Sequence, residues 1–387
     1  MARLGDICTL VNGYAFKPTD WKTEGLPIIR IQNLNDTTAP FNYFNGEIDR
    51  KYVVNDGDLL FSWSGTPGTS FGAFFWRRGK GVLNQHIFNV YPVDGINKAY
   101  LRYALNGNIS RIIDKAHGGV GLQHITKKEL VEIDIPILSE EQQKQIVIVL
   151  DSVDKLIVLR KEQLAKLDQL VKSRFMELFG DPETNPMGWK RITVQQAINE
   201  KIIDKPLDGN HGGKHPKTSD YVPTGVPFIM ANNLVDGHVD LEHCAFISKK
   251  QADSLDKGFA KDGDVLITHK GTIGRTAILH CSYPYIMLTP QVTYYRPISG
   301  IIPEYLKAYF DTDYFQGIIG NIASVGSTRA YIGITAQQEL PLLIPEMEKQ
   351  KEYTAFVEQT DKSKLAIQQS LDKLELLKKS LMQEYFG

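Results

Sequence analysis

Residues 143–180 read QKQIVIVLDSVDKLIVLRKEQLAKLDQLVKSRFMELFG, and residues 350–387 read QKEYTAFVEQTDKSKLAIQQSLDKLELLKKSLMQEYFG. The two stretches align without a gap at a constant offset of 207 residues (387 minus 180). Identical positions are spread along the whole alignment and include the final Phe-Gly pair. A period of about 200 residues is too long for a solenoid, so the chain contains two copies of one large module.

The repeated stretch has the pattern of a long helix. Ser139 fits an N-terminal cap, and acidic residues follow it in the first turn. Gly180 fits a C-terminal cap. We therefore predict long helices at 139–180 and 346–387, each spanning about 60 Å if some 40 residues are helical. Apolar residues recur between these caps at alternating spacings of three and four, namely Ile146, Leu150, Val153, Ile157, Leu164, Leu167 and Val171.

Charged residues interrupt this apolar stripe in both copies. They are Arg160 and Arg174 in the first copy and Lys364 and Lys378 in the second. A lone helix of this kind is not stable in water, whereas two copies in one chain can pair with each other. Because the chain must pass through a whole domain before the second helix, an antiparallel coiled coil is the simpler closure.

The residues before each helix show a mixed pattern. Short β-rich runs are bounded by Gly, Pro, Asn and Asp, and short helical stretches lie among them. The same motifs recur in the same order in both halves. We therefore predict an α+β fold with two pseudo-symmetric α/β domains, 1–138 and 181–345, separated by the two long helices. The β-rich runs are 58–63, 86–91, 264–268 and 291–295, and the helical stretches are 99–106 and 303–314.

The composition is that of an ordinary globular protein, with 42% hydrophobic and 23% charged residues. No apolar run is long enough to span a bilayer. The scattered cysteines Cys8, Cys244 and Cys281 form no disulfide framework, which favours the cytoplasm. The 44 basic and 45 acidic residues give a net charge of -1. A protein that binds nucleic acid unaided is usually more basic, so either DNA is not the ligand or a partner supplies much of the phosphate contact.

Catalytic and cofactor motifs are absent from the sequence. It has neither the Asn/Asp-Pro-Pro-aromatic signature of amino methyltransferases nor a P-loop. Each Asp-Gly-Asp motif brackets a glycine before an apolar strand, which favours a turn over a metal site. His211 and His215 have a zinc-like spacing, but they lie on a Gly-rich loop. The dipeptide His-Cys occurs at 243–244 and again at 280–281. Neither copy has the local C-x-x-C or H-x-x-x-H pairing of structural zinc sites. We expect no metal, no cofactor and no catalytic residue.

Two motif pairs carry a resemblance to a known family. An Asp-Gly-Asp-hydrophobic run followed by Gly-Thr-x-Gly occurs at 56–68 and again at 262–274. A hydrophobic-Pro hinge before a helix rich in Glu, Gln and Lys, ending in Phe-Gly, also occurs twice. In this order and spacing the chain resembles the DNA specificity subunit of type I restriction–modification systems over essentially its whole length.

The resemblance implies a non-catalytic subunit that binds double-stranded DNA. Two target recognition domains would each read one half of a bipartite site. The paired helices would set the spacing between the half-sites and dock two methyltransferase subunits, and restriction–translocase subunits would join for cleavage. The near-neutral charge fits this picture, because the partners can share the phosphate contacts that supply most non-specific affinity.

The duplication also separates scaffold from candidate base readers. Positions shared by both halves favour scaffold, such as the glycines of the Gly-Thr-x-Gly turns. Loop positions with polar or aromatic side chains, above all those that differ between halves, favour contact with DNA. The candidates are Lys17, Trp63, Ser64, Thr66, Arg77, Arg78, Asn84, Gln85, His86, Gln123, His124, Lys214, His215, Lys217, His269, Lys270, Thr272, Arg275, Gln291, Thr328, Arg329 and Tyr331.

Two other interpretations remain open from the sequence. The chain could be a coiled-coil scaffold whose globular domains bind proteins. It could also be the specificity chain of a related system in which methylation and cleavage share one partner polypeptide.

Overall fold

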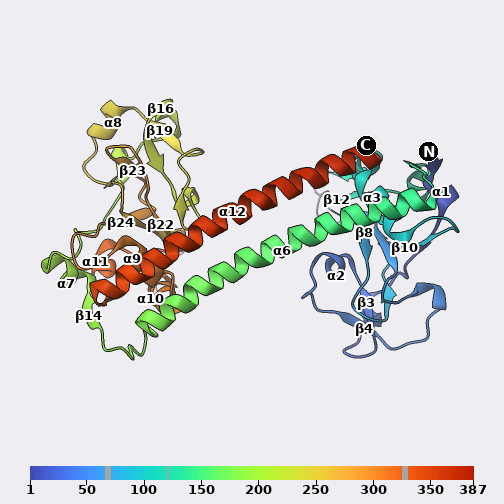
Figure 1. The fold of residues 1–387 in the computed structure, drawn as a ribbon, viewed down its shortest axis with the longest axis horizontal. Coiled ribbons are helices and arrows are strands. Elements are labelled where there is room, and N and C mark those ends of the chain that lie inside the picture. Colours follow the sequence, from blue (N-terminus) through green and yellow to red (C-terminus); the bar gives the residue numbers. More distant parts are fainter. Residues whose placement is uncertain (66–70, 120–121, 325–329) are drawn as a thin grey trace. The chain divides into compact units, whose positions relative to one another are not determined.

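A computed structural model describes residues 1–65, 71–119, 122–324 and 330–387, which fall into two compact units (Figure 1). Unit 1 comprises Met1–Glu162 and Gln368–Gly387, and unit 2 comprises Gln163–Ile367. The long helices α6 (Glu140–Phe179) and α12 (Met347–Phe386) each contribute to both units. Because the division cuts through both helices, the predicted domain boundaries stay predictions. No helix in the described part of the chain is long and apolar enough to cross a membrane.

Unit 1 has two main sheets, and its largest core forms where one sheet meets the long helices. That sheet has the order β2-β10-β6-β8, and the second has the order β4-β3-β9-β5. Helix α3 (Lys98–Gly107) packs with the first sheet, beside the start of α6 and the end of α12. The strands are β2 (Cys8–Asn12), β10 (Ile87–Pro92), β6 (Leu59–Ser62), β8 (Gly72–Phe75), β4 (Asn42–Phe44), β3 (Leu26–Ile29), β9 (Gly81–Leu83) and β5 (Val53–Val54).

Unit 2 repeats this plan with additional strands in its larger sheet. Its larger sheet has the order β15-β24-β21-β22-β18-β17, and its second sheet has the order β19-β16-β23-β20. The strands are β15 (Leu207–Asp208), β24 (Val292–Tyr295), β21 (Val265–Lys270), β22 (Thr272–Ile278), β18 (His238–Val239), β17 (Leu234–Val235), β19 (Ala245–Ile247), β16 (Tyr221–Ile229), β23 (Ile286–Leu288) and β20 (Phe259–Ala260).

Smaller elements complete both units. Short strand pairs link the two ends of each domain: β1 (Ala2–Arg3) pairs with β13 (Asp134–Ile135), and β14 (Lys190–Thr193) pairs with β25 (Pro341–Ile344). The remaining elements are α1 (Leu4–Ile7), α2 (Ile31–Asn35), β7 (Ser64–Gly65), α4 (Ile109–Asp114), β11 (His117–Gly119), β12 (Leu122–His124), α5 (Lys127–Leu130), α7 (Val194–Asn199), α8 (Lys249–Asp253), α9 (Pro303–Phe310), α10 (Asp313–Ser324), α11 (Ile334–Gln338) and five 3-10 turns.

The strand registers match between the units, which confirms the predicted duplication. In unit 1, β3 runs parallel to β9 with Ile29 opposite Leu83. In unit 2, β16 runs parallel to β23 with Ile229 opposite Leu288. The predicted β-rich runs are all present as strands, with ends shifted by a few residues at most. The predicted helix 303–314 is wrong in its continuity, because α9 ends at Phe310 and the Thr312 hydroxyl accepts a hydrogen bond from Phe315 N (3.3 Å) as α10 begins.

Each long helix is fastened to a globular domain by a buried glutamine. The Gln143 amide donates to Gly95 O (3.1 Å) and Leu138 O (2.9 Å), and its oxygen accepts from Asn97 N (2.8 Å). Gln350 repeats this arrangement with Gly300 O, Pro345 O and Ile302 N. Because both side chains are fully enclosed, each satisfied amide fixes where its helix leaves the domain.

The other end of each helix fills a domain core. Phe386 is 1% exposed, and its ring lies 5.4 Å from that of Tyr100 in unit 1. Phe179 is equally buried in unit 2, where its ring lies 4.7 Å from that of Tyr305. A side chain at Gly107 would collide with Phe386, which shows how closely α3 approaches the end of α12.

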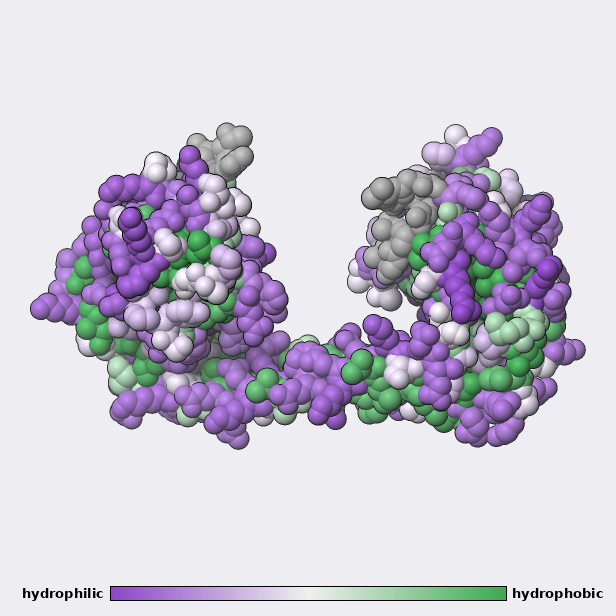
Figure 2. All heavy atoms as spheres, turned by 90° about the horizontal axis from the view of Figure 1, so that it is seen from above, coloured by the Kyte–Doolittle hydropathy of each residue, from purple (hydrophilic) through white to green (hydrophobic). Residues whose placement is uncertain are grey.

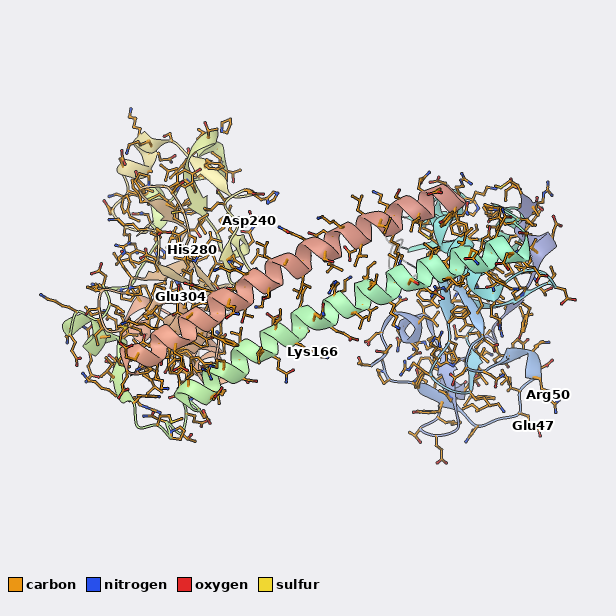
Figure 3. All side chains as sticks on the ribbon, viewed as in Figure 1. Glu47, Arg50, Lys166, Asp240, His280 and Glu304 are labelled. Carbon is orange, nitrogen blue, oxygen red and sulfur yellow. The ribbon has the colours of Figure 1, made fainter. Side chains whose placement is uncertain are left out.

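Within each unit, α6 and α12 pair in opposite directions. The charged residues that interrupt the apolar stripe make contacts between the helices: Lys378 pairs with Asp154 (2.7 Å) in unit 1, and Lys364 pairs with Asp168 (2.6 Å) in unit 2. Arg160 donates to Ser370 Oγ (3.2 Å), and Arg174 pairs with Glu352. The predicted antiparallel coiled coil is therefore confirmed within each unit (Figure 3, where Lys166 marks the unit 2 part of α6).

We predict that Phe386→Ala lowers the free energy of unfolding of unit 1 by about 3–5 kcal/mol, because it leaves a cavity against Tyr100. Three of the four tryptophans (Trp21, Trp63 and Trp76) lie in unit 1, so denaturant unfolding followed by tryptophan fluorescence reports mainly on that unit. The control Leu376→Ala removes a side chain that is 69% exposed and should change little. An equal effect of both substitutions would contradict the role of Phe386.

Candidate nucleic-acid interface

In both units, the strand that follows the Asp-Gly-Asp motif leads to the same backbone frame. Trp63 N donates to His86 O (3.3 Å), and Trp63 O accepts from Ile125 N (3.1 Å). His269 N likewise donates to Gln291 O (2.9 Å), and His269 O accepts from Ile332 N (2.9 Å). Positions 63 and 269 are therefore equivalent, as the sequence alignment proposed, but the side chains on the two frames differ.

The glycine turns that follow have the backbone conformation that their residue type favours. Gly65, Gly271 and Gly274 have positive φ angles of 135°, 80° and 85°. The Asp-Gly-Asp motifs also act as turns: Asp58 accepts from Asn55 N (2.9 Å) and Asp264 accepts from Lys261 N (2.7 Å). Arg296 pairs with Asp264 as well, so this carboxylate is already partnered.

Trp63 is half-buried in unit 1 and packs against neighbouring side chains. Its indole Nε1 donates to Asn12 Oδ1 (3.1 Å), and its ring lies 5.8 Å from Phe88 and 5.3 Å from His86. Beside it, the Gln85 amide lies 3.3 Å from His86 Nε2. Burial lowers the pKa of His86, and the positive charge of Arg30 lowers it further. The neutral imidazole can therefore both donate and accept hydrogen bonds at this edge.

His269 is enclosed, unlike the sequence expectation that it could enter a DNA groove. It is 1% exposed, and its Nδ1 lies 2.7 Å from Thr293 Oγ1, which in turn accepts from the Gln337 amide (3.2 Å). On its other side, Nε2 lies 3.7 Å from Asp208 Oδ2. Burial lowers the pKa of His269 to about 4 despite the nearby Asp208 carboxylate. The side chain is therefore a neutral internal support and does not reach the surface.

Asp208 organises the charges around this support. It is 1% exposed and pairs with Lys257 and with His211 Nε2 (2.6 Å). Burial raises the pKa of Asp208, but the hydrogen bonds from Lys257 and His211 outweigh burial and hold the pKa below its usual value. Asp208 and Lys257 were not predicted as site residues, because nothing in the local sequence indicates that they approach His269.

The surface of unit 2 above this network is basic and aromatic. Lys270 Nζ lies 5.9 Å from the centre of the Tyr331 ring, and Tyr331 is 42% exposed. Gly271 N donates to Ala330 O (3.0 Å), which ties this segment to the glycine turn. Gln291 and Thr272 are exposed at the same edge. These side chains combine stacking surface, positive charge and hydrogen-bonding groups, as nucleic-acid interfaces do.

The Gly-rich loop at 210–217 ends in a turn that both units share. Lys17 N donates to Asp20 Oδ2 (2.7 Å), and Lys217 N donates to Asp220 Oδ2 (2.7 Å). Lys214 pairs with Asp256, and His215 lies beside Phe228, with 5.7 Å between ring centres. Lys17, Lys214 and Lys217 are exposed, and His215 is half-buried.

Other candidates lie elsewhere. Arg77 and Arg78 follow β8, beside the start of β6, whereas Trp63 follows the end of β6. Arg78 packs over Phe41 at 4.1 Å and donates to Ala39 O (3.3 Å), so it holds a loop in place. Asn84 N donates to Ile29 O (3.0 Å) behind Gln85, and Ser64 and Gln123 lie in β7 and β12, where Ser64 pairs with His124. Thr66, Thr328 and Arg329 lie outside the described residues.

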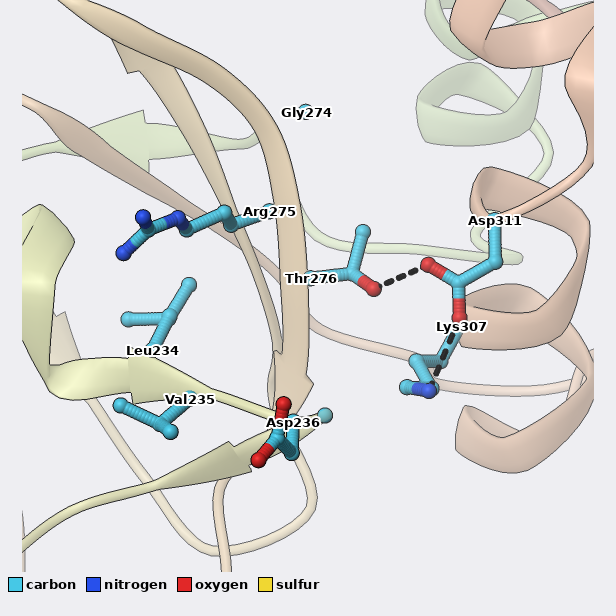
Figure 4. A pocket seen from close by; sticks show the side chains of 9 residues that line it. Leu234, Val235, Asp236, Gly274, Arg275, Thr276, Lys307 and Asp311 are labelled. Carbon is cyan, nitrogen blue, oxygen red and sulfur yellow. Dashed lines mark hydrogen bonds and ion pairs between the residues drawn. The ribbon is translucent and has the colours of Figure 1, made fainter. Parts of the chain in front are cut away.

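Arg275 lines an open pocket of about 390 Å³ in unit 2, between the β17–β18 turn and α9 (Figure 4). Lys307 and Asp311 form an ion pair (2.8 Å) on the opposite wall, and the Thr276 hydroxyl donates to Asp311. The guanidinium of Arg275 extends towards Leu234, away from this pair (Figure 4). Arg275 therefore lines this pocket without contacting the Lys307–Asp311 ion pair.

Among the described residues, no group of three or more His, Cys, Asp or Glu side chains is placed to hold a metal ion. His243 pairs instead with Asp240 (3.0 Å), which is labelled in Figure 3 together with the exposed His280.

Two copies of one α+β domain, each with its own polar edge and each fastened to a long helix, define a duplicated recognition protein. The chain belongs to the family of the type I restriction modification DNA specificity domain, whose model matches residues 1–169 and 207–376. The two matched segments correspond to the two halves of the internal repeat.

Relatives agree with this assignment. The chain is 25% identical over 329 residues to the type I restriction enzyme EcoBI specificity subunit of Escherichia coli, covering 78% of this chain and 65% of that protein. It is 23% identical over 394 residues to the MjaVIII specificity subunit of Methanocaldococcus jannaschii, covering 99% and 90%.

The fold is shared with solved structures. The S subunit of a type I restriction-modification system from M. genitalium matches with a TM-score of 0.57 at 14% identity, covering 100% of this chain and 95% of that one. A chain from a study of complex assembly in the type I R-M system matches with a TM-score of 0.59 at 17% identity, covering 100% and 96%.

We predict that unit 2 loses stability as the pH falls from about 6.5 to about 4. In this window the unfolded chain binds a proton at His269 while the folded chain does not, because the folded pKa is lowered to about 4. The loss should reach roughly 3 kcal/mol. Asp208, whose folded pKa is also lowered, loses its contribution only below this window.

Calorimetric unfolding between pH 7.5 and 4.5 measures this effect. His269→Gln should flatten the pH dependence of the unit 2 transition, and His280→Gln at an exposed position should leave it unchanged. Equal pH slopes for the wild type and His269→Gln would contradict the enclosed neutral histidine.

Proposed function

We propose that this chain is the DNA specificity subunit of a type I restriction–modification complex, and that each unit reads one half of a bipartite site in double-stranded DNA. The observation that carries the proposal is the pair of matching backbone frames at positions 63 and 269, whose edges carry different side chains. These are Gln85 and His86 in unit 1, and Lys270 and Gln291 in unit 2. A shared frame with different groups at its edge suits two half-sites of different sequence. Methylation and cleavage would belong to partner subunits.

The electrostatics support a shared interface with partners. The chain has a net charge of -1, and several of its basic side chains are paired, as Lys257 is with Asp208 and Lys214 with Asp256. Non-specific DNA affinity depends mainly on phosphate neutralisation. We therefore infer that methyltransferase subunits supply much of the phosphate contact, while this chain supplies base contacts.

We further propose that α6 and α12 set the distance between the half-sites. The helix pairing supports this role in both units, because cross-helix contacts such as Lys378–Asp154 and Lys364–Asp168 fix one antiparallel register. An uninterrupted helix also has a defined rise of 1.5 Å per residue, so its length translates directly into a spacing.

Inserting seven helical residues after Glu162 and seven after Ile367 should lengthen the gap in the recognised motif by about three base pairs without changing the bases read. Seven residues add about 10 Å and rotate the helix by only some 20° from two full turns. Sequencing of methylated adenines in cells that express the whole complex measures the motif. Insertion into α6 alone, which shifts the helix register, is the control and should abolish the motif. Altered bases with an unchanged gap would contradict the spacer role.

The docking of two methyltransferase subunits is supported by apolar residues on the outside of the helices. Ile148, Val149, Leu156 and Leu159 are 57%, 39%, 43% and 43% exposed. At 100° per residue they fall within an arc of about 100°, whose centre lies about 120° from that of the buried stripe that includes Leu150. Apolar residues also reach the surface along the helical segments in Figure 2. A contiguous exposed apolar stripe is typical of a protein interface.

We predict that the double substitution Leu156→Lys/Leu159→Lys prevents co-purification with the methyltransferase subunits, because two charges would be buried at the contact. Circular dichroism should show unchanged helicity, since both side chains are exposed. Asp94→Lys, on an exposed loop of the recognition domain, changes the net charge equally and should leave assembly intact. Assembly of the double variant at wild-type yield would exclude this stripe as the docking surface. The participation of restriction subunits rests on the family relationship alone.

A further inference from the structure

Arg30 is a cation at the surface of unit 1 that no ion pair neutralises within the described chain. It follows β3 directly, and its guanidinium lies 5.2 Å from the centre of the Trp21 ring. One nitrogen, Nη1, donates to Asn42 Oδ1 at 3.3 Å. A guanidinium has five N–H donors, so this contact leaves most of them available. Stacking on Trp21 and the Asn42 contact restrict the side chain, so less conformational entropy is lost when it binds a ligand.

The neighbours of Arg30 belong to the candidate interface. Asn84 N donates to Ile29 O (3.0 Å), which places the turn that carries Gln85 and His86 beside the end of β3. The charge of Arg30 acts on His86, whose pKa it lowers in addition to the effect of burial. Here a single cation, Arg30, lies near the neutral amide of Gln85 and the neutral imidazole of His86. A phosphate-binding surface would instead be expected to carry a cluster of lysines. This mixture fits the edge of a base pair in the major groove.

Unit 2 has the same backbone at this position with a different side chain. Arg30 N donates to Asn33 Oδ1 at 3.0 Å, and Met230 N donates to Asn233 Oδ1 at 2.9 Å. Asn84 N to Ile29 O is likewise matched by Thr289 N to Ile229 O (2.9 Å). Because a methionine has no donor, this position can distinguish the bases read by the two units.

We propose that Arg30 reads a guanine in the half-site bound by unit 1, donating two hydrogen bonds from its guanidinium to O6 and N7. This inference rests on the proposed function and adds a specificity-determining residue to it. A bidentate arginine–guanine pair discriminates against the wrong base by roughly 10- to 100-fold. Met230 leaves unit 2 without this contact.

The test uses the complete complex with its methyltransferase subunits and measures binding to duplexes that carry each base in turn at every position of the motif. The wild type should require guanine at one position of one half-site. Arg30→Met, which introduces the residue of unit 2, should weaken binding to that duplex about 10- to 100-fold and make the four bases nearly equivalent there. Arg30→Lys should retain part of the affinity and little of the preference, since lysine lacks the planar pair of donors. The other half-site should be unchanged.

Arg102→Met is the matched control, because Arg102 also lies over an aromatic ring (4.2 Å from Tyr103) but pairs with Asp151 on α6. It should leave the base preference intact. A second measurement uses the wild-type protein and therefore does not depend on how the variants fold. Replacing the required guanine by 7-deazaguanine removes the N7 acceptor, and this should weaken binding by the wild type but add no further loss for Arg30→Met.

The possible results distinguish a failure of the proposed function from a failure of the role of Arg30. A wild-type complex without a bipartite motif would overturn the proposed function as a whole. A motif whose half-sites are both insensitive to 7-deazaguanine and to Arg30→Met would overturn the role of Arg30 alone. Equal weakening on every duplex, with the salt dependence reduced by about one phosphate contact, would show that Arg30 binds the backbone and would also overturn base reading.

Discussion

The structure depends on burying the ends of two long helices inside the recognition domains. A helix with an interrupted apolar stripe is marginal alone, and a small α+β domain with one open side exposes its core. Phe386 and Phe179 close these cores, and Gln143 and Gln350 fasten the opposite helix ends. Unit 1 therefore contains residues from both ends of the chain, and its core is complete only when the C-terminal helix has returned. Formation of either domain is thus coupled to formation of the helix pair.

The charged residues that interrupt the apolar stripe determine how the two helices pair more than they add to their stability. Lys364 and Lys378 are partly exposed, and surface ion pairs of this kind contribute about 0–1 kcal/mol each. An apolar stripe alone would permit sliding or a parallel partner. Cross-helix pairs with Asp168 and Asp154 form in only one antiparallel register. Their effect is therefore on the geometry in which the two helices pair.

The sequence predicted regular features well and long-range polar contacts poorly. The helix period, the caps and the duplicated strand order depend on neighbouring residues, so the helices and the strand runs could be predicted. The enclosure of His269 depends on Asp208 and Gln337, each more than 60 residues away, and a Gly-flanked polar residue was therefore assumed to be exposed. Arg30 was missed for another reason. It directly follows a strand that both units share, whereas the search for base readers considered loop positions. Arg30 and Met230 nevertheless already differ in the sequence.

The backbone frame that both units share limits which residues can be substituted at each polar edge. The backbone contacts at positions 63 and 269 do not depend on side chains, so the surface residues Gln85, Lys270 and Gln291 can vary without loss of the fold. The supporting layer is less free. In unit 1 the supporting layer consists of the packed rings of Trp63, His86 and Phe88. The effect of a substitution there depends on how closely the replaced ring is packed. In unit 2 it is a buried polar network, and removing one member would leave a carboxylate or an amide without its partner, which costs more than a lost contact. Substitutions that leave the fold of unit 2 intact therefore have to occur at its surface, above an unchanged His269 and Asp208.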